Sequence, residues 1–257
     1  MINRSVEMDA NMETILTDLV RRLKEFAADN LESVILYGSA ARGDYHESHS
    51  DLNVLCTLRS LSVVELTRIA PAITWWCTEK KEPAPMLFTS QELQHSAAVF
   101  SIELLDIQKS HRVLYGPDIV SGISVPMNLH RLQVEHDLRI IILKLRQRFL
   151  SASQKPQELS AILAESISSV RTLLRHALIA LNEEPPAAPH DLFKRIAEIC
   201  GAQTATSLDR AWSARATSLP ADETSGIYGA YLTTLEQVIH CLDSHAPKHE
   251  WQRRSAK

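Results

Sequence analysis

The chain has 257 residues, which is enough for one large domain or two smaller ones. An apolar fraction of 45% can supply a core, whereas aromatic residues make up only 5% and glycine occurs only seven times, which argues against an all-β fold with many tight turns. The formal net charge of −4 lacks the overall basic character of a nucleic-acid-binding domain, so nucleic acid is not an expected partner.

The sequence favours a cytoplasmic protein with no membrane association. Residues 1–10 are polar and charged, which is unlike a signal peptide. No apolar run is long enough to span a bilayer. The cysteines are scattered through apolar stretches without metal-ligand spacing, so we expect reduced thiols in the core. They are Cys56, Cys77, Cys200 and Cys241.

Helix and strand patterns alternate in the first half of the chain. Apolar residues at helical spacing predict a helix over 12–28, and Ser62 with Glu65 predicts the N-terminus of a second helix over 62–78. Ser90 is expected to cap a short third helix. Short β-rich runs bounded by polar residues predict strands. These runs are 33–37, 52–58, 85–89 and an edge strand at 113–115.

From about Met127 onward the pattern is helical. The expected helices cover 129–149, 156–181, 191–200, 204–216 and 224–242. The sequence therefore predicts an α+β fold, with a small mixed sheet followed by an all-α helical bundle. We expect the first domain at 1–125, the bundle at 126–246 and a basic tail at 247–257.

The segment from Leu36 to Leu55 carries the chemistry. A strand that ends at Gly38-Ser39 and enters a turn of helix exposes backbone N–H groups, which bind phosphate oxygens together with the serine hydroxyl. Asp51 and Asn53 lie two residues apart on the next predicted strand, so they point to the same side. A carboxylate at that place suits Mg²⁺, which bridges phosphate oxygens.

The pattern Gly38-Ser39-Ala40-Ala41-Arg42-Gly43-Asp44, followed by Ser50-Asp51-Leu52-Asn53, resembles the nucleotidyltransferase superfamily. This is the polymerase-β-like fold that includes aminoglycoside nucleotidyltransferases. The resemblance implies a small mixed sheet and a helical bundle that shapes the acceptor site. It implies that Gly38, Ser39 and Arg42 contact phosphates, and that Asp51 and Asn53 are the catalytic positions that hold Mg²⁺ or Mn²⁺.

The sequence departs from the family at two acidic positions. The second acidic position of the motif is occupied by Asn53, whose amide oxygen can bind a metal but adds no negative charge. The third carboxylate is expected near the third strand, where 84–89 contains no acid. Glu82 precedes that strand, and Glu103 or Asp106 would substitute only if their segment folds beneath the site. Losing one such group typically lowers the rate on the order of 10²–10³-fold.

The leading hypothesis is therefore a nucleotidyltransferase-like protein that binds a nucleoside triphosphate with Mg²⁺ and has weak or lost transfer of a nucleoside monophosphate to a hydroxyl acceptor. A fully active nucleotidyltransferase acting on a small molecule or protein is one alternative. A HEPN-like RNA-cleaving or toxin–antitoxin-type protein is another, because Arg171 and His176 have the Arg-x₄-His spacing of that family. The first long helix of the bundle is also basic, which indicates a solvated face or an anion-attracting patch.

Overall fold

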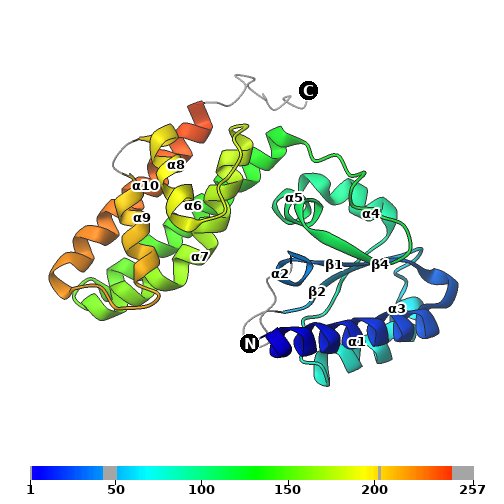
Figure 1. Cartoon of the computed structure of the whole chain (residues 1–257). Helices are drawn as coiled ribbons and strands as arrows, with labels where there is room; N and C mark the ends of the chain where they lie inside the picture. The colour runs from blue at the N-terminus through cyan, green and yellow to red at the C-terminus, as the bar shows by residue number, and fades with distance from the viewer. Residues whose placement is uncertain (1, 43–50, 202–203, 245–257) are drawn as a thin grey trace, which may run out of the picture. The chain divides into compact units, whose positions relative to one another are not determined.

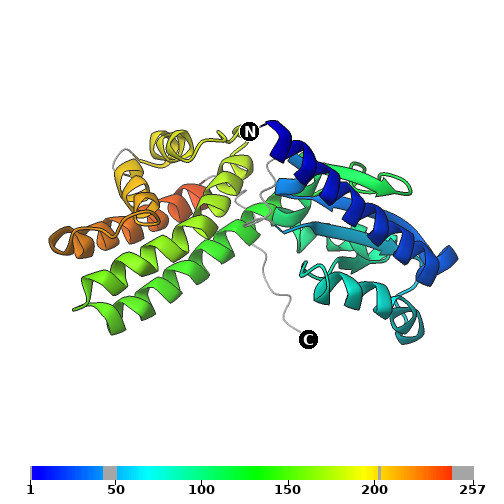
Figure 2. The same ribbon diagram turned by 60° about the horizontal axis from the view of Figure 1, so that its bottom comes forward.

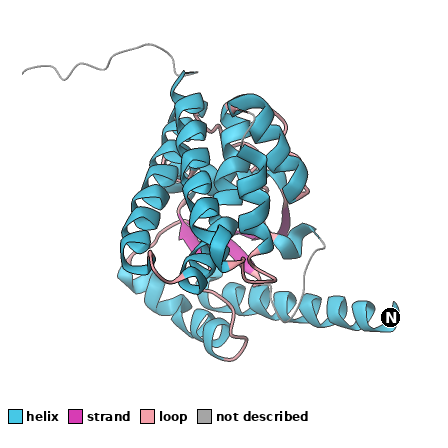
Figure 3. Ribbon diagram, turned by 90° about the vertical axis from the view of Figure 1, so that its left-hand side faces the viewer, coloured by secondary structure: helices cyan, strands magenta, loops and turns pink. Residues whose placement is uncertain are grey.

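A computed structural model describes residues 2–42, 51–201 and 204–244, with the side chains of 2–9 and 204 left out. The chain divides into two compact units, Met1–Pro126 and Met127–Lys257. The first combines a sheet with helices and the second is helical, which confirms the predicted α+β class (Figures 1 and 3). Within the described residues, no helix has the length and apolar character needed to cross a bilayer. The predicted tail at 247–257 lies outside the described residues.

The first unit contains a four-stranded mixed sheet in the order β3-β2-β1-β4. β1 is antiparallel to both β2 and β4, whereas β2 and β3 are parallel. The strands are β1 Leu31–Tyr37, β2 Asn53–Leu58, β3 Met86–Phe88 and β4 His111–Tyr115. The small mixed sheet therefore forms from the four runs that the sequence indicates.

Two long helices, α1 Ile2–Ala27 and α3 Val63–Thr78, cover one face of the sheet (Figures 1 and 2). Their buried side chains, such as Leu19 and Trp76, pack against Val54 and the other residues of the strands that point to this side. α1 starts ten residues before the predicted helix, because the polar segment ahead of Met12 contains no proline or glycine to stop it. Burial of this apolar stripe is what holds α1 on the sheet.

The opposite face is covered by α4 Ser90–His95 and α5 Ser101–Lys109. Leu104 of α5 and Leu93 of α4 pack there against Ile35 and Leu55. The sequence pattern does not predict α5. The predicted cap of α4, Ser90, lies one residue after the observed cap. Thr89 is the N-cap: its Oγ1 accepts the Glu92 N–H at 3.1 Å, and the Glu92 carboxylate accepts the Thr89 N–H at 2.8 Å. This reciprocal pair satisfies two N–H groups, which a cap at Ser90 would not.

The second unit is a bundle of α helices (Figure 2). Its core is closed by buried tyrosines as well as aliphatic residues: the Tyr228 hydroxyl donates to the Leu145 carbonyl at 2.8 Å, and the Tyr231 hydroxyl lies 3.2 Å from Ser166 Oγ. The helices are α6 Met127–Ala152, α7 Pro156–Ala180, α8 Pro189–Cys200, α9 Thr204–Ser213 and α10 Ala221–Ser244. Short 3-10 turns at Ala28–Asn30 and Ser96–Ala98 and the single-turn helix α2 Ser39–Arg42 complete the described elements.

Candidate phosphate and metal site

Gly38 stands where β1 ends and α2 begins, and its backbone is left-handed with a φ of +82°. Its predecessor Tyr37 pairs with Asn53 across the β1–β2 ladder. A β-carbon added at Gly38 would lie 3.3 Å from Asn53 Nδ2. The left-handed backbone angle favours glycine, and a β-carbon would also require the Asn53 side chain to shift slightly. The structure thus brings together Gly38 and Asn53, which the sequence places 15 residues apart.

Ser39 is half-buried at the first position of α2, and Arg42 is exposed at the last. The predicted phosphate contacts therefore occupy a single turn that follows directly on the Gly38 bend. The continuation of the motif at Gly43, Asp44 and Ser50 lies outside the described residues.

The side chains of β2 alternate between the two faces of the sheet, which fixes the direction of Asn53. Leu52, Val54 and Cys56 join the core beneath α1 and α3, whereas Leu55 joins the core beneath α4 and α5. Asn53 is therefore on the α4–α5 side, half-buried at the start of the strand. Asp51 precedes β2 by two residues and is exposed.

Glu82 lies beside Asp51. Its Oε2 accepts the backbone N–H of Leu52 at 2.6 Å. Burial raises the pKa of Glu82, the Leu52 hydrogen bond lowers it in part, and the charge of Asp51 raises it further. From the sequence, Glu82 precedes the third strand, and its distance from Asp51 is open. The parallel pairing of Leu55 with Met86 explains the outcome, because extending that register backwards brings residue 82 level with residue 51.

No acid occurs on β3 itself, which consists of Met86, Leu87 and Phe88. The paired residues of β2 and β3 are Leu55–Thr57 and Met86–Phe88, and an extension of this register would bring the exposed Ala84 level with Asn53. Among the described residues, no group of three or more histidine, cysteine, aspartate or glutamate side chains is arranged to hold a metal ion.

Tyr37 forms part of the surface next to Asn53. Its hydroxyl lies 3.2 Å from Met86 Sδ, so the phenol reaches from β1 across β2 to β3. Burial raises the pKa of Tyr37, and the negative charge of Glu103 on α5 raises it further. Glu103 is exposed, and α5 covers the sheet face to which Asn53 belongs. Glu103, one of the two acids that the sequence offered as substitutes, therefore acts electrostatically on this surface.

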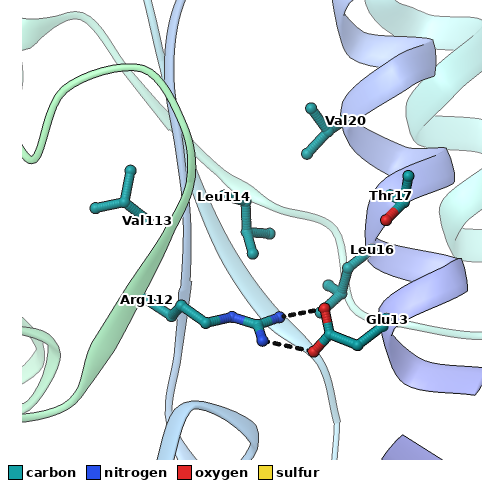
Figure 4. Close-up of a pocket in the computed structure, with 7 residues that line it drawn as sticks. All are labelled: Glu13, Leu16, Thr17, Val20, Arg112, Val113 and Leu114. Carbon is teal, nitrogen blue, oxygen red and sulfur yellow. Dashed lines mark hydrogen bonds and ion pairs between the residues drawn. The ribbon is translucent and has the colours of Figure 1, made fainter. Parts of the chain in front are cut away.

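A cavity of about 360 Å³ lies elsewhere, between α1 and β4 (Figure 4). It is crossed by a two-bond ion pair in which Arg112 Nη1 and Nη2 donate to Glu13 at 2.5 and 3.2 Å. Arg112 pairs with Leu36, whose side chain belongs to the α1 face. The cavity therefore opens on the face opposite Asn53 and is not part of the Gly38 site.

The bundle residues that suggested a HEPN-like nuclease contact different neighbours. His176 is fully buried, with its ring 5.1 Å from that of His130. Arg171 instead lies over the ring of Trp212 at 5.6 Å and donates to the Ala187 carbonyl at 3.1 Å. An RNA-cleaving histidine must reach solvent, and this one does not, so the arrangement gives no support to that hypothesis.

The basic character of α6 is largely cancelled by neighbouring acids. Arg139 bonds both Glu135 and Asp243, at 2.7 and 3.2 Å. Arg146 bonds Glu236 at 2.6 Å. Arg148 bonds Glu165 at 2.7 Å, and Arg131 bonds Glu135 at 3.1 Å. These pairs favour the solvated face over the anion-attracting patch.

Comparison with solved structures identifies a similar fold. Spectinomycin adenyltransferase from Enterococcus faecialis, whose crystal structure was solved with ATP and spectinomycin, superposes with a TM-score of 0.52. The match covers 90% of this chain and 99% of that protein, at 13% sequence identity. No protein-family model and no curated protein sequence matches the chain. This chain and the adenyltransferase therefore share a fold, although their sequences are only 13% identical.

Proposed function

We propose that this protein binds a nucleoside triphosphate with Mg²⁺ (or Mn²⁺) at the Gly38 end of β1. The observation that carries the proposal is the left-handed Gly38 held against Asn53, at the start of α2, in a fold similar to that of an ATP-using adenyltransferase. In this arrangement the backbone N–H groups that follow Gly38 and the Ser39 hydroxyl would hold the phosphates, with Arg42 as a further cation.

The side chains opposite the loop fit a divalent cation of the hard, oxygen-preferring kind. Asp51 and Glu82 supply two carboxylates and Asn53 supplies an amide oxygen, and Mg²⁺ usually fills its remaining positions with water and phosphate oxygens. When bound, the ion would neutralise the phosphates and polarise the α-phosphate. These residues would hold the ion beside the loop that binds the phosphates.

We further propose that transfer of a nucleoside monophosphate to a hydroxyl acceptor is weak or lost. Asn53 provides no charge, and β3, which consists of Met86, Leu87 and Phe88, carries no acid. The acceptor would be a small molecule or a protein, and the neighbour's own ligands, ATP and spectinomycin, support the small-molecule class. The active alternative rests on Glu82, because a second carboxylate beside Asp51 partly replaces the missing charge.

A binding and transfer assay tests both parts of the proposal. The protein is titrated with ATP, CTP, GTP and UTP in Mg²⁺ or Mn²⁺ by calorimetry, and α-labelled nucleotides are used to follow transfer to the protein and to a panel of hydroxyl acceptors. We expect binding that Ser39→Ala weakens about tenfold, through the loss of a charge-assisted hydrogen bond. Ser213→Ala, at an exposed serine of α9, is the matched control.

Asn53→Asp tests the impaired-transfer hypothesis. The added carboxylate should tighten Mg²⁺ binding and raise transfer above that of the natural chain, alone or together with Ala84→Glu. Strong transfer by the natural chain would instead establish the active alternative. Absence of nucleotide binding, with Ser39→Ala equal to the natural protein, would reject the proposal.

A further inference from the structure

α6 carries apolar side chains on two opposite sides. The inner side, with Val134, Leu138 and Leu145, is buried in the bundle. A second set is exposed, from 37% for Ile140 to 80% for Leu150. This second set, here named the α6 stripe, consists of Leu129, Leu132, Ile140, Leu143 and Leu150.

The α6 stripe is continuous along the helix. An α-helix turns about 100° per residue, so steps of three, seven and eight residues keep these side chains within one narrow sector. The exposed His136 and Gln147 fall in the same sector and fill the gaps. The stripe extends over roughly 30 Å, at a rise of 1.5 Å per residue. Single exposed leucines are ordinary, but a stripe along one helix is typical of a helix–helix interface.

The charges beside the stripe indicate which helix packs there. Asp137 and Lys144 are seven residues apart, so they flank the stripe on the same side. The ion-pair partner of Asp137 is its exposed neighbour His136, and among the described residues Lys144 forms no ion pair. The arginines of α6, by contrast, already have partners within the bundle.

A second α6 in antiparallel orientation satisfies both the apolar and the charged side chains. Asp137 lies three residues before Ile140 and Lys144 lies four residues after it. Two antiparallel helices that cross near Ile140 therefore place each Asp137 opposite the Lys144 of the other. In a parallel two-fold pair the charged flanks of the two helices would lie on opposite sides of the interface, so Asp137 and Lys144 would not meet. The apolar stripe pairs with itself in either orientation, so the charges decide.

We propose that the α6 stripe is a self-association surface on which α6 of a second copy of this chain packs antiparallel. The interface is isologous, as in a two-fold symmetric dimer, and lies entirely on the bundle. It is independent of the proposed nucleotide site, so either proposal can fail without the other.

The first test measures molecular mass against concentration by analytical ultracentrifugation, from about 1 to 100 μM, a range suited to weak and moderate dimers. We expect a dimer, with Leu143→Glu raising the dissociation constant at least tenfold. Val63→Glu, at an exposed valine of α3 in the first unit, is the matched control and should leave the dimer unchanged. A monomer throughout overturns the proposal. A dimer that Leu143→Glu leaves intact also overturns it. The same holds if the protein is a monomer and a substitution in the α6 stripe lowers its melting temperature, because another part of the chain would then cover α6.

The second test concerns charge. Asp137→Lys alone and Lys144→Asp alone should each weaken the dimer about tenfold, because each creates two like-charge contacts. The double reversal should restore the natural affinity, since the coupling between the two positions is then regained. Additive losses in the double variant would overturn the antiparallel arrangement.

The third test fixes the orientation. Under mild oxidation, Ile140→Cys lies near the crossing point and should form a disulfide-linked dimer. Leu150→Cys should not, because the two copies of residue 150 would be separated by roughly 30 Å, far beyond disulfide reach. The natural chain, with its four cysteines free, gives the background. Cross-linking at both positions would indicate a parallel pair and contradict the proposal.

Discussion

At the scale of single residues, Gly38 has the tightest constraints near the candidate site. Its φ of +82° is strained for any other residue, and an added β-carbon would lie 3.3 Å from Asn53 Nδ2. We expect Gly38→Ala to lower the free energy of unfolding by about 1–2 kcal/mol, because a left-handed alanine is strained. Nucleotide binding should fall by more than that loss explains, since the loop would move away from the phosphates.

Chemical denaturation and nucleotide titration of the same variant separate the two effects. Gly226→Ala provides a control: it lies in α10, and an added β-carbon there meets nothing within 4 Å. Unchanged nucleotide affinity in a folded Gly38→Ala protein would contradict the role given to this loop.

Glu82 leads to a prediction about pH. Its folded pKa is raised by burial and by Asp51, so the folded state favours the protonated carboxyl. Stability from this group is therefore full below the unfolded pKa of about 4.3 and is lost as the pH rises through the higher folded value. At pH 7, Glu82→Gln should raise the melting temperature by about 1–3 °C. The amide still accepts the Leu52 N–H but carries no charge.

The advantage of Glu82→Gln should disappear as the pH falls to about 4, where Glu82 itself becomes neutral. Saturating Mg²⁺ should stabilise the natural protein more than the variant, because a ligand that binds the folded state raises its stability. Glu79→Gln, at an exposed glutamate, is the control. A variant less stable than the natural protein at pH 7 and equally responsive to Mg²⁺ would show that Glu82 is only a structural acceptor.

At the scale of elements, Gly116 closes the turn after β4. It has a φ of +76°, and a β-carbon there would lie 2.0 Å from the carbonyl oxygen of Glu32. The Ser33 hydroxyl donates to the Tyr115 and Pro117 carbonyls on either side, at 3.1 and 2.8 Å, which fixes the turn against β1. We expect Gly116→Ala to lower the free energy of unfolding by roughly 3 kcal/mol or more, because backbone has to move. Gly122→Ala, which meets nothing within 4 Å, should change it by less than about 0.5 kcal/mol. Equal stability of the two variants would refute this account of the turn.

The elements show what sequence patterns can and cannot specify. The four strands and the long helices follow from local periodicity and turn residues. α5 was missed because its apolar residues, among them Leu104 and Ile107, are interrupted by Glu103 and Asp106 over only nine residues. The sequence names Glu82 but does not place it beside Asp51, because strand register is a non-local property: Glu82 lies 31 residues further on and is brought near by the pairing of β2 with β3.

The exposed side of α6 was missed for a different reason. The buried side of this helix carries Leu138 and Leu145. Leu132 and Leu143 lie on the opposite side, which weakens the helical periodicity of the whole segment. A helix with two apolar sides is ambiguous in sequence, since only the packing of the bundle shows which side is left exposed.

At the scale of the whole molecule, the two units have separate cores. Leu19, Val54 and Trp76 belong to the first unit, whereas Leu145, Tyr228 and Tyr231 close the second. Each unit is large enough to fold as a domain of ordinary size. We therefore expect two unfolding transitions in calorimetry, one for each unit.

Two variants assign the transitions. Tyr228→Phe removes the hydrogen bond to the Leu145 carbonyl and should cost about 1 kcal/mol, which lowers the bundle transition by roughly 3–6 °C. Gly116→Ala should lower only the other transition, because Gly116 packs on Glu32 of the first unit. Mg²⁺ with a nucleoside triphosphate should raise the transition that Gly116→Ala lowers, since Gly38 and Asp51 lie in that unit. If each variant shifts a single common transition by its full amount, the units unfold together. Their cores are then coupled more strongly than their separate packing implies.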